Sequence, residues 1–181
     1  AAPASEVYLH EMPGGQFTNL KAQARSMGME EKWHDIAETY AEVNQMFGDI
    51  VKVTPSSKVV GDMALMMVAQ NLNREDVENP NTDVAFPESV VDMLKGNLGQ
   101  PPGGFPKHIV TKALKGEKPN LDRPGKNLDP IDLEKTRQEL SEKLDGMKID
   151  DEDLNGYLMY PKVFLDYMER HLTYGPVRTL P

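Results

Sequence analysis

The residue types best suited to chemistry gather in residues 53–62, which have the sequence VTPSSKVVGD. Thr54, followed by Pro55, predicts a helix start in which the Thr54 hydroxyl is the N-cap and accepts from a backbone N–H of the first turn. Free N–H groups, the positive end of the helix dipole, the Ser57 hydroxyl and the Lys58 ammonium would then meet at one point. An anion or a developing oxyanion would be stabilised there. The alternative interpretation is an ordinary capped helix with a solvated lysine.

A second candidate lies in residues 11–20, which have the sequence EMPGGQFTNL. A Pro-Gly-Gly turn would lead there into a helix capped by Thr18 or Asn19. Two adjacent glycines let the backbone approach a ligand closely, and Gln16 offers an amide that both donates and accepts. The segment lacks the Gly-Lys-Ser/Thr ending of a phosphate-binding loop. A flexible turn before a helix is the alternative interpretation.

Metal and thiol chemistry find little support in the composition. The chain has no cysteine, which excludes disulfides, thiolate zinc sites and thiol nucleophiles. Its four histidines are scattered, and His34 with Asp35 is best interpreted as a surface pair. We therefore predict no metal site in the chain.

The charge balance is acidic, with 20 Lys and Arg against 29 Asp and Glu and a net charge of -9. Such a chain is a poor candidate for binding a phosphate backbone, so we expect no nucleic-acid partner. Residues 1–90 hold 14 acids and 6 bases, whereas residues 91–181 hold 15 and 14. No apolar run approaches the roughly 20 residues of a membrane span, and no signal peptide is visible. We expect a soluble chain without a membrane partner, and its start without methionine suggests a piece of something longer.

Helices are the elements expected to position these residues, since period-two alternation and hairpin turns are almost absent. One face of the second predicted helix is apolar at steps of three and four, through Trp33, Ile36, Tyr40, Val43 and Phe47. A charged helix is expected to follow, with Asp129 as its N-cap and Pro130 at its first position. The predicted helices are 19–29, 30–47, a helix from 55, 87–94, 107–114, 129–144, 151–160 and 161–172.

The connections between these helices are long and rich in proline and glycine, notably in residues 99–104 and 116–127. Helical bundles usually join neighbouring helices in roughly two to eight residues. A mean hydropathy of -0.54 is also lean for an independent globule. We therefore expect an all-α, irregular multi-helix fold that lies on another domain, with better defined helices in 1–115, an irregular connection in 116–128 and C-terminal helices in 129–181.

Three stretches in the same order, residues 11–20, 44–62 and 157–164, resemble the pyruvate carboxylase family. The resemblance is to the later part of the carboxyltransferase domain, the helical funnel that follows its α/β barrel. It covers most of the chain and is strongest in residues 6–70 and 157–176. It implies that residues 1–181 are the C-terminal helical part of such a domain, a funnel-like piece normally packed on a (β/α)8 barrel.

The resemblance implies a biotin-dependent ligase. Such an enzyme carboxylates biotin with ATP and bicarbonate, then transfers the carboxyl group from carboxybiotin to pyruvate and forms oxaloacetate, a step of gluconeogenesis and anaplerosis. It implies that Thr54 is the proton-relaying threonine and that Gln16, Ser57 and Lys58 lie near the biotin ureido group. The divalent metal, the ATP site and the biotinyl lysine would belong to other domains. The chain alone would then bind no cofactor and would be inactive.

The resemblance also implies partners. These are the barrel of the same domain, the biotin carrier domain, and pyruvate or oxaloacetate, within a homo-oligomeric parent. The parent would be cytoplasmic in a bacterium, or located in the mitochondrial matrix in a eukaryote.

The implied role of Thr54 suits its chemistry. A threonine hydroxyl that donates and accepts in one step can relay a proton despite its high pKa.

Two other functions remain open at this stage. An oxaloacetate decarboxylase or transcarboxylase subunit has a related funnel, but those relatives tend to have a different residue in place of Gln16 and a glutamine in place of Lys58. The chain could instead be a non-catalytic helical interaction module.

Overall fold

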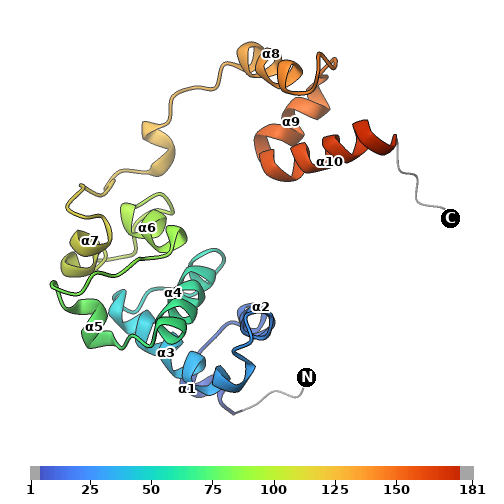
Figure 1. Ribbon diagram of the computed structural model, residues 1–181. Helices are drawn as coiled ribbons and strands as arrows, with labels where there is room; N and C mark the ends of the chain where they lie inside the picture. Colours follow the sequence, from blue (N-terminus) through green and yellow to red (C-terminus); the bar gives the residue numbers. More distant parts are fainter. Residues whose placement is uncertain (1–4, 176–181) are drawn as a thin grey trace. The chain divides into compact units, whose positions relative to one another are not determined.

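Helices are the regular elements of residues 5–175, the part of the chain that the computed structural model describes (Figure 1). This confirms the expected all-α class for those residues. Two 3-10 helices lie at Glu30–Lys32 and Pro124–Asn127. The α-helices are α1 (Val7–His10), α2 (Gly14–Ser26), α3 (Trp33–Met46), α4 (Ser56–Gln70), α5 (Arg74–Glu78), α6 (Glu88–Lys95), α7 (Lys107–Ala113), α8 (Leu133–Lys143), α9 (Asp151–Met159) and α10 (Pro161–Tyr174).

The chain divides into two compact units, Ala1–Leu128 and Asp129–Pro181. In the first unit, α4 packs against α2, α3 and α6 and forms the centre of the core. Its apolar residues cover more than half of the helix surface. Such a helix is stable in water only when neighbouring helices cover it, which accounts for its central place. The buried side chains of α4 include Val59, Val60, Met63, Ala64, Leu65 and Met67.

Helix α3 packs on α4 through the face that the sequence predicts. Ile36, Tyr40 and Val43 are buried there, and Phe47 directly after the helix is buried as well. Trp33, at the first position of α3, is only half-buried and packs at the edge of the core against Phe17. The 3.6-residue period is therefore a good guide to this element.

Helix α2 begins five residues before the expected start at Asn19. Pro13 has extended geometry at the N-cap, and the two glycines after it adopt helical geometry. Thr18 consequently lies in the second turn, where its hydroxyl donates to the Gly14 carbonyl at 3.2 Å. The expected cap by Thr18 or Asn19 is therefore wrong, and this earlier start puts Gln16 on the helix.

The C-terminal unit forms a small core from α8, α9 and α10, with Leu140, Leu144, Ile149, Leu154 and Met168 buried. The expected break at Tyr160 is confirmed, since that residue ends α9 and precedes α10.

Helix α8 begins later than expected. Its N-cap is Asp132, which accepts from the Lys135 N–H at 3.0 Å, in place of the predicted Asp129. Pro130 and Ile131 separate the two aspartates, so Asp132 is the carboxylate directly before the first helical residue and takes the capping role.

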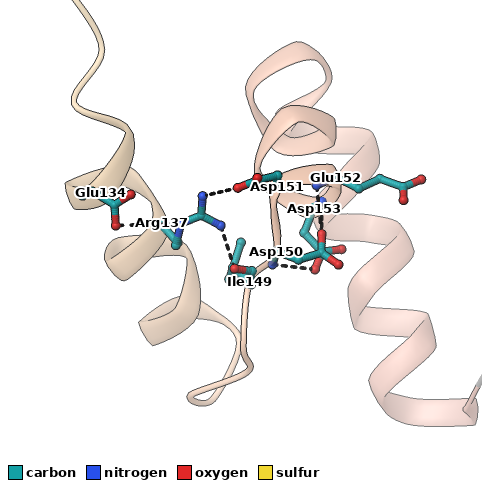
Figure 2. Close-up of polar contacts among 7 residues, drawn as sticks. All are labelled: Glu134, Arg137, Ile149, Asp150, Asp151, Glu152 and Asp153. Atoms are coloured by element: carbon teal, nitrogen blue, oxygen red, sulfur yellow. Dashed lines mark hydrogen bonds and ion pairs between the residues drawn. The ribbon is translucent and has the colours of Figure 1, made fainter.

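Arg137 joins helix α8 to the start of α9, as Figure 2 shows. Its guanidinium donates to the Ile149 carbonyl at 2.7 Å and to Asp151 Oδ1 at 2.6 Å. Next to it, Asp150 caps α9 by accepting from the N–H groups of Glu152 and Asp153. One side chain thus connects the two helices across the loop between them.

Part of the long connections is held by hydrogen bonds within the first unit. The Asn120 N–H donates to the Lys95 carbonyl at 2.7 Å, and the Gln100 side chain donates to the Asn120 carbonyl at 2.9 Å. Lys112 Nζ donates to the carbonyl of Val77, near the end of α5, and to that of Asn79, directly after the helix. The unit therefore supplies some of the surface that its own loops need.

Among the described residues, no helix combines the length and apolar character needed to cross a membrane.

Candidate functional site

A cleft of about 610 Å³ lies between helix α2 and the segment that leads into α4. All four residues singled out from the sequence, Gln16, Thr54, Ser57 and Lys58, line it. They come from two segments that are far apart in the chain, so the fold brings the two candidate motifs to one place. The remaining lining residues are Pro13, Gly15, Asn19, Ala22, Gln23, Lys52 and Val53.

Gln16 projects from the first turn of α2 into the wall of this cleft. The residue is buried, with 7% of its surface exposed, and its Nε2 is enclosed without a hydrogen-bond partner in residues 5–175. An enclosed amide that lacks a partner costs about 1–3 kcal/mol of folding free energy. Natural proteins rarely keep such a group, and a ligand that accepts a hydrogen bond is one explanation for it.

The opposite wall begins at Thr54, which is exposed and joined to Pro55 by a cis peptide bond. Helix α4 starts at Ser56, and no side chain caps it. Ser56 makes the side-chain hydrogen bonds of this turn. Its Oγ accepts from the Val53 N–H at 3.1 Å, and it lies 2.7 Å from the Val51 carbonyl, to which it can donate. The expected Thr54 cap is therefore wrong, and the Thr54 hydroxyl has no intramolecular role of that kind.

The expected group of free backbone donors is also wrong. The N–H of Ser57 donates to the Val53 carbonyl at 3.0 Å, and those of Lys58 and Val59 donate to the Pro55 carbonyl at 3.0 and 3.2 Å. The turn before α4 supplies these acceptors, so the first-turn amides are already paired. The hydrogen-bonding capacity on this wall comes from side chains.

Ser57 is buried at the base of the wall, with 5% of its surface exposed. Its backbone carbonyl accepts a hydrogen bond from the Tyr40 hydroxyl of α3 at 3.3 Å. Burial raises the pKa of the Tyr40 phenol above its ordinary value, so the hydroxyl keeps its proton and remains a donor. The core of the unit thereby fixes the backbone that positions the Ser57 hydroxyl.

Lys58 is exposed at the rim of the cleft, and Asp62, one turn further along α4, accepts from its Nζ at 2.6 Å. The same Asp62 oxygen accepts from the Ser89 hydroxyl of α6 at 2.7 Å. The ammonium therefore belongs to a small network and is not simply solvated.

Lys52 is a lining residue that the sequence analysis did not select. Its Nζ lies 3.0 Å from Glu11 Oε2, and only 14% of the Lys52 side chain is exposed. Glu11 precedes α2, so this ion pair connects the two walls of the cleft. Residues two apart in an extended segment point to the same side, and this rule could have placed Lys52 beside Thr54.

Metal binding has no geometric support within residues 5–175. No three His, Asp or Glu side chains there lie close enough together to hold an ion. The cleft is lined by hydroxyl, amide and ammonium groups, which suit an anionic or carbonyl ligand better than a cation.

The chain matches the family model described as "Conserved carboxylase domain" over residues 7–181. It is 49% identical over 179 residues to pyruvate carboxylase of Bacillus subtilis and 44% identical over 177 residues to the mitochondrial pyruvate carboxylase of Homo sapiens. These alignments cover 99% and 97% of the chain but only 16% and 15% of the relatives. The chain thus corresponds to about one sixth of the length of these enzymes.

Solved structures give the same result. The carboxyl transferase domain of Rhizobium etli pyruvate carboxylase with pyruvate and biocytin matches with a TM-score of 0.91 and 62% identity, covering all of the chain and 30% of the domain. The complete multifunctional enzyme from the same organism matches with a TM-score of 0.90 and 62% identity, covering all of the chain and 18% of the enzyme. From the family match over residues 7–181 and this agreement in fold, the chain belongs to the conserved carboxylase domain family.

Proposed function

We propose that the chain is the C-terminal helical part of a carboxyltransferase domain in a biotin-dependent pyruvate carboxylase. In this role it contributes to carboxyl transfer from carboxybiotin to pyruvate, which gives oxaloacetate. The observation that supports this most strongly is the cleft that Gln16 and Thr54 line together from two distant segments. The similar R. etli domain has been solved with pyruvate and biocytin.

The residues of the cleft fit the ureido head of biotin. This group has one carbonyl oxygen that accepts hydrogen bonds, and the Gln16 side chain in the cleft wall carries a donor, Nε2, that has no partner among the described residues. The Ser57 hydroxyl and the Lys58 ammonium line the same cleft as further donors. When bound, biotin would supply the carboxyl group for transfer. Donors aimed at the ureido oxygen would hold the ring and stabilise negative charge that develops there.

Thr54 is proposed as the residue that moves the proton. The residue is exposed and lines the cleft, and its hydroxyl is not used as a helix cap. A hydroxyl can donate its own proton while it accepts another, so Thr54 Oγ1 would take a proton from the methyl group of pyruvate and give its own proton to the biotin nitrogen that has lost the carboxyl group. The turn before α4 fixes the backbone at this point through the hydrogen bonds of Ser56.

Lys58 would act from the rim. Its ion pair with Asp62 is between residues four apart on an exposed helix face, and 57% of the lysine side chain is exposed. Such pairs contribute only about 0.3–0.5 kcal/mol. Turning the ammonium toward a developing negative charge would therefore cost little.

Other parts of the reaction are proposed to lie outside this chain. The metal ion, the ATP site and the biotinyl lysine belong to the rest of the parent enzyme, with the barrel and the biotin carrier domain as partners of this segment. Val51 and Val53, beside the cleft, have 71% and 60% of their surface exposed, which supports cover by another domain. The parent would be a homo-oligomer of the cytoplasm or, in a eukaryote, of the mitochondrial matrix.

The proposal is tested by decarboxylation of oxaloacetate, the reverse of carboxyl transfer, with free biotin as acceptor. The chain alone should have no activity, whereas the complete carboxyltransferase domain should be active. Thr54→Ala in that domain should lower kcat by about 100-fold or more, because a general acid–base group contributes about 10²–10⁴. Thr54→Ser should retain more activity since it keeps the hydroxyl. Full activity in Thr54→Ala would disprove the relay, and would favour a non-catalytic role for this segment.

A further inference from the structure

Gly61 lies in the interior of helix α4, where glycine normally costs helix stability relative to alanine. Its backbone has ordinary helical geometry, since it is not among the glycines with positive φ. Conformational freedom is therefore not the reason for a glycine at this position. The reason lies in what surrounds it.

A Cβ at position 61 would overlap Gln16 Nε2 and would come within 3.1 Å of Leu20 Cδ1. Both neighbours belong to α2, so the missing side chain is what lets the Gln16 amide lie against α4. The overlap is with the far end of a flexible side chain, which can rotate away. The fold can therefore accept an alanine at 61, but the Gln16 amide cannot keep its place.

The position of this amide matters because its nitrogen is enclosed and has no hydrogen-bond partner in the described part of the chain. Contact with Gly61 holds the group in the wall of the cleft that Thr54 lines from the other side. Without that contact the amide would leave its fixed place in the cleft wall and gain rotational freedom, which a ligand would have to remove on binding.

We infer that Gly61 is a positioning residue for Gln16, and that it acts through Gln16 to set the affinity of the cleft for the ureido group. This inference rests on the proposed function, because it assumes that Gln16 binds biotin. Gly61 itself would not touch the ligand.

The test uses the complete carboxyltransferase domain, a domain that has been solved by itself in the R. etli relative. Oxaloacetate decarboxylation is measured with free biotin as the probe. Gly61→Ala should raise the KM for biotin by about 3- to 10-fold, the range that corresponds to one hydrogen bond, with kcat changed by less than about twofold. Its Tm should equal or exceed that of the wild type, and a crystal structure should show the Gln16 amide displaced.

Gly156→Ala is the matched control. Gly156 also lies inside a helix, α9, and its added Cβ would approach Phe164 Cδ2 at the same 3.1 Å, so its neighbour is an aromatic ring of α10 and not Gln16. This variant should leave the KM for biotin unchanged. In a Gln16→Ala background, Gly61→Ala should change that KM by less than about twofold, because both substitutions act on the same group.

The outcomes separate the two hypotheses. If Gln16→Ala raises the KM for biotin and Gly61→Ala does not, the inference about Gly61 is overturned and the proposed function stands. If Gln16→Ala itself has no effect, the proposed role of Gln16 fails and the inference fails with it. If Gly61→Ala alone unfolds the domain, the added Gln16→Ala should restore the wild-type Tm, and an unfolded double variant would also overturn the inference.

Discussion

His10 illustrates how a single buried group can make the first unit sensitive to acid. Its ring is buried with 2% of the surface exposed, and Nδ1 accepts from the Met12 N–H at 2.9 Å. Desolvation lowers the pKa of His10 below its ordinary value, against a smaller raising effect from Glu6. Protonation would charge a buried ring and remove the acceptor for Met12, so the native state favours the neutral imidazole.

The corresponding prediction concerns stability below about pH 6.5, the ordinary pKa of histidine. There the unfolded chain binds a proton at His10 that the native chain does not, so the free energy of unfolding should fall as pH falls. One such proton contributes at most about 1.4 kcal/mol per pH unit. His10→Asn, whose amide oxygen can replace Nδ1 as acceptor, should reduce this dependence in urea unfolding between pH 7 and 5. An unchanged slope would contradict the burial argument, and His171→Asn in the other unit is the control.

Much of the chemistry of the cleft could be predicted from residue types, but not the pairing of its charges. Thr54, Ser57 and Lys58 are close in sequence, so their proximity follows from any helix start. The partner of Lys58 at Asp62 also follows from helical spacing. The enclosed, unpaired state of Gln16 Nε2 could not be predicted, since it depends on the packing of α2 against α4.

At the scale of elements, the two walls of the cleft are joined by the ion pair between Lys52 and Glu11. Lys52 is largely buried, so loss of Glu11 leaves a poorly solvated charge without its partner. Glu11→Gln and Lys52→Met should each lower kcat/KM for oxaloacetate decarboxylation by about 5- to 10-fold, equivalent to about 1–1.4 kcal/mol, because the walls lose their alignment. Lys52→Arg should retain most of the activity.

A double-mutant cycle checks whether the pair acts as a unit. The Glu11→Gln and Lys52→Met double variant should be no worse than the poorer single variant. Lys95→Met provides the control, because the pair of Lys95 with Glu117 also joins distant segments but lies outside the cleft. Additive losses in the cycle would show that the two residues act separately.

For the C-terminal unit, the prediction concerns the stability that Arg137 gives to the junction of α8 and α9 (Figure 2). Arg137→Met removes two charge-assisted hydrogen bonds from α8, one to Ile149 in the loop and one to Asp151 in α9, so the local free energy of opening should fall by about 1.5–3 kcal/mol. Hydrogen exchange in residues 133–159 should then become faster, and Arg137→Lys should restore it only in part because lysine lacks the planar fork. Lys135→Met, which removes an exposed pair with Glu139, is the control and should have little effect. Unchanged exchange in Arg137→Met would disprove this role.

The elements that could be predicted are those with a long apolar period. Helices α3 and α4 follow this pattern, and the break between α9 and α10 falls at Tyr160, directly before the proline that begins α10. Helices α1 and α5 were not predicted, because four or five residues are too few to establish a period. The start of α2 was misplaced because glycine and proline are usually signs of a turn, whereas here Pro13 directly precedes the helix.

For the molecule as a whole, the charge of the cleft differs from the simple expectation of a local positive spot. Its two lysines, Lys52 and Lys58, are each paired with a carboxylate, of Glu11 and Asp62. These two pairs balance each other in charge, so they leave the site without a net positive charge. Long-range attraction of an anion is then a weak effect, and we expect binding to depend on directed donors such as Gln16 more than on net charge.

The central claim, that Thr54 moves the proton, is tested most directly by exchange of the pyruvate methyl protons in deuterated water. The complete carboxyltransferase domain is incubated with pyruvate and free biotin, and deuterium incorporation is followed by NMR. The account predicts that Thr54→Ala slows exchange by about 100-fold or more while pyruvate still binds, and that Thr54→Ser retains a large part of the rate. Exchange at the wild-type rate in Thr54→Ala would contradict it.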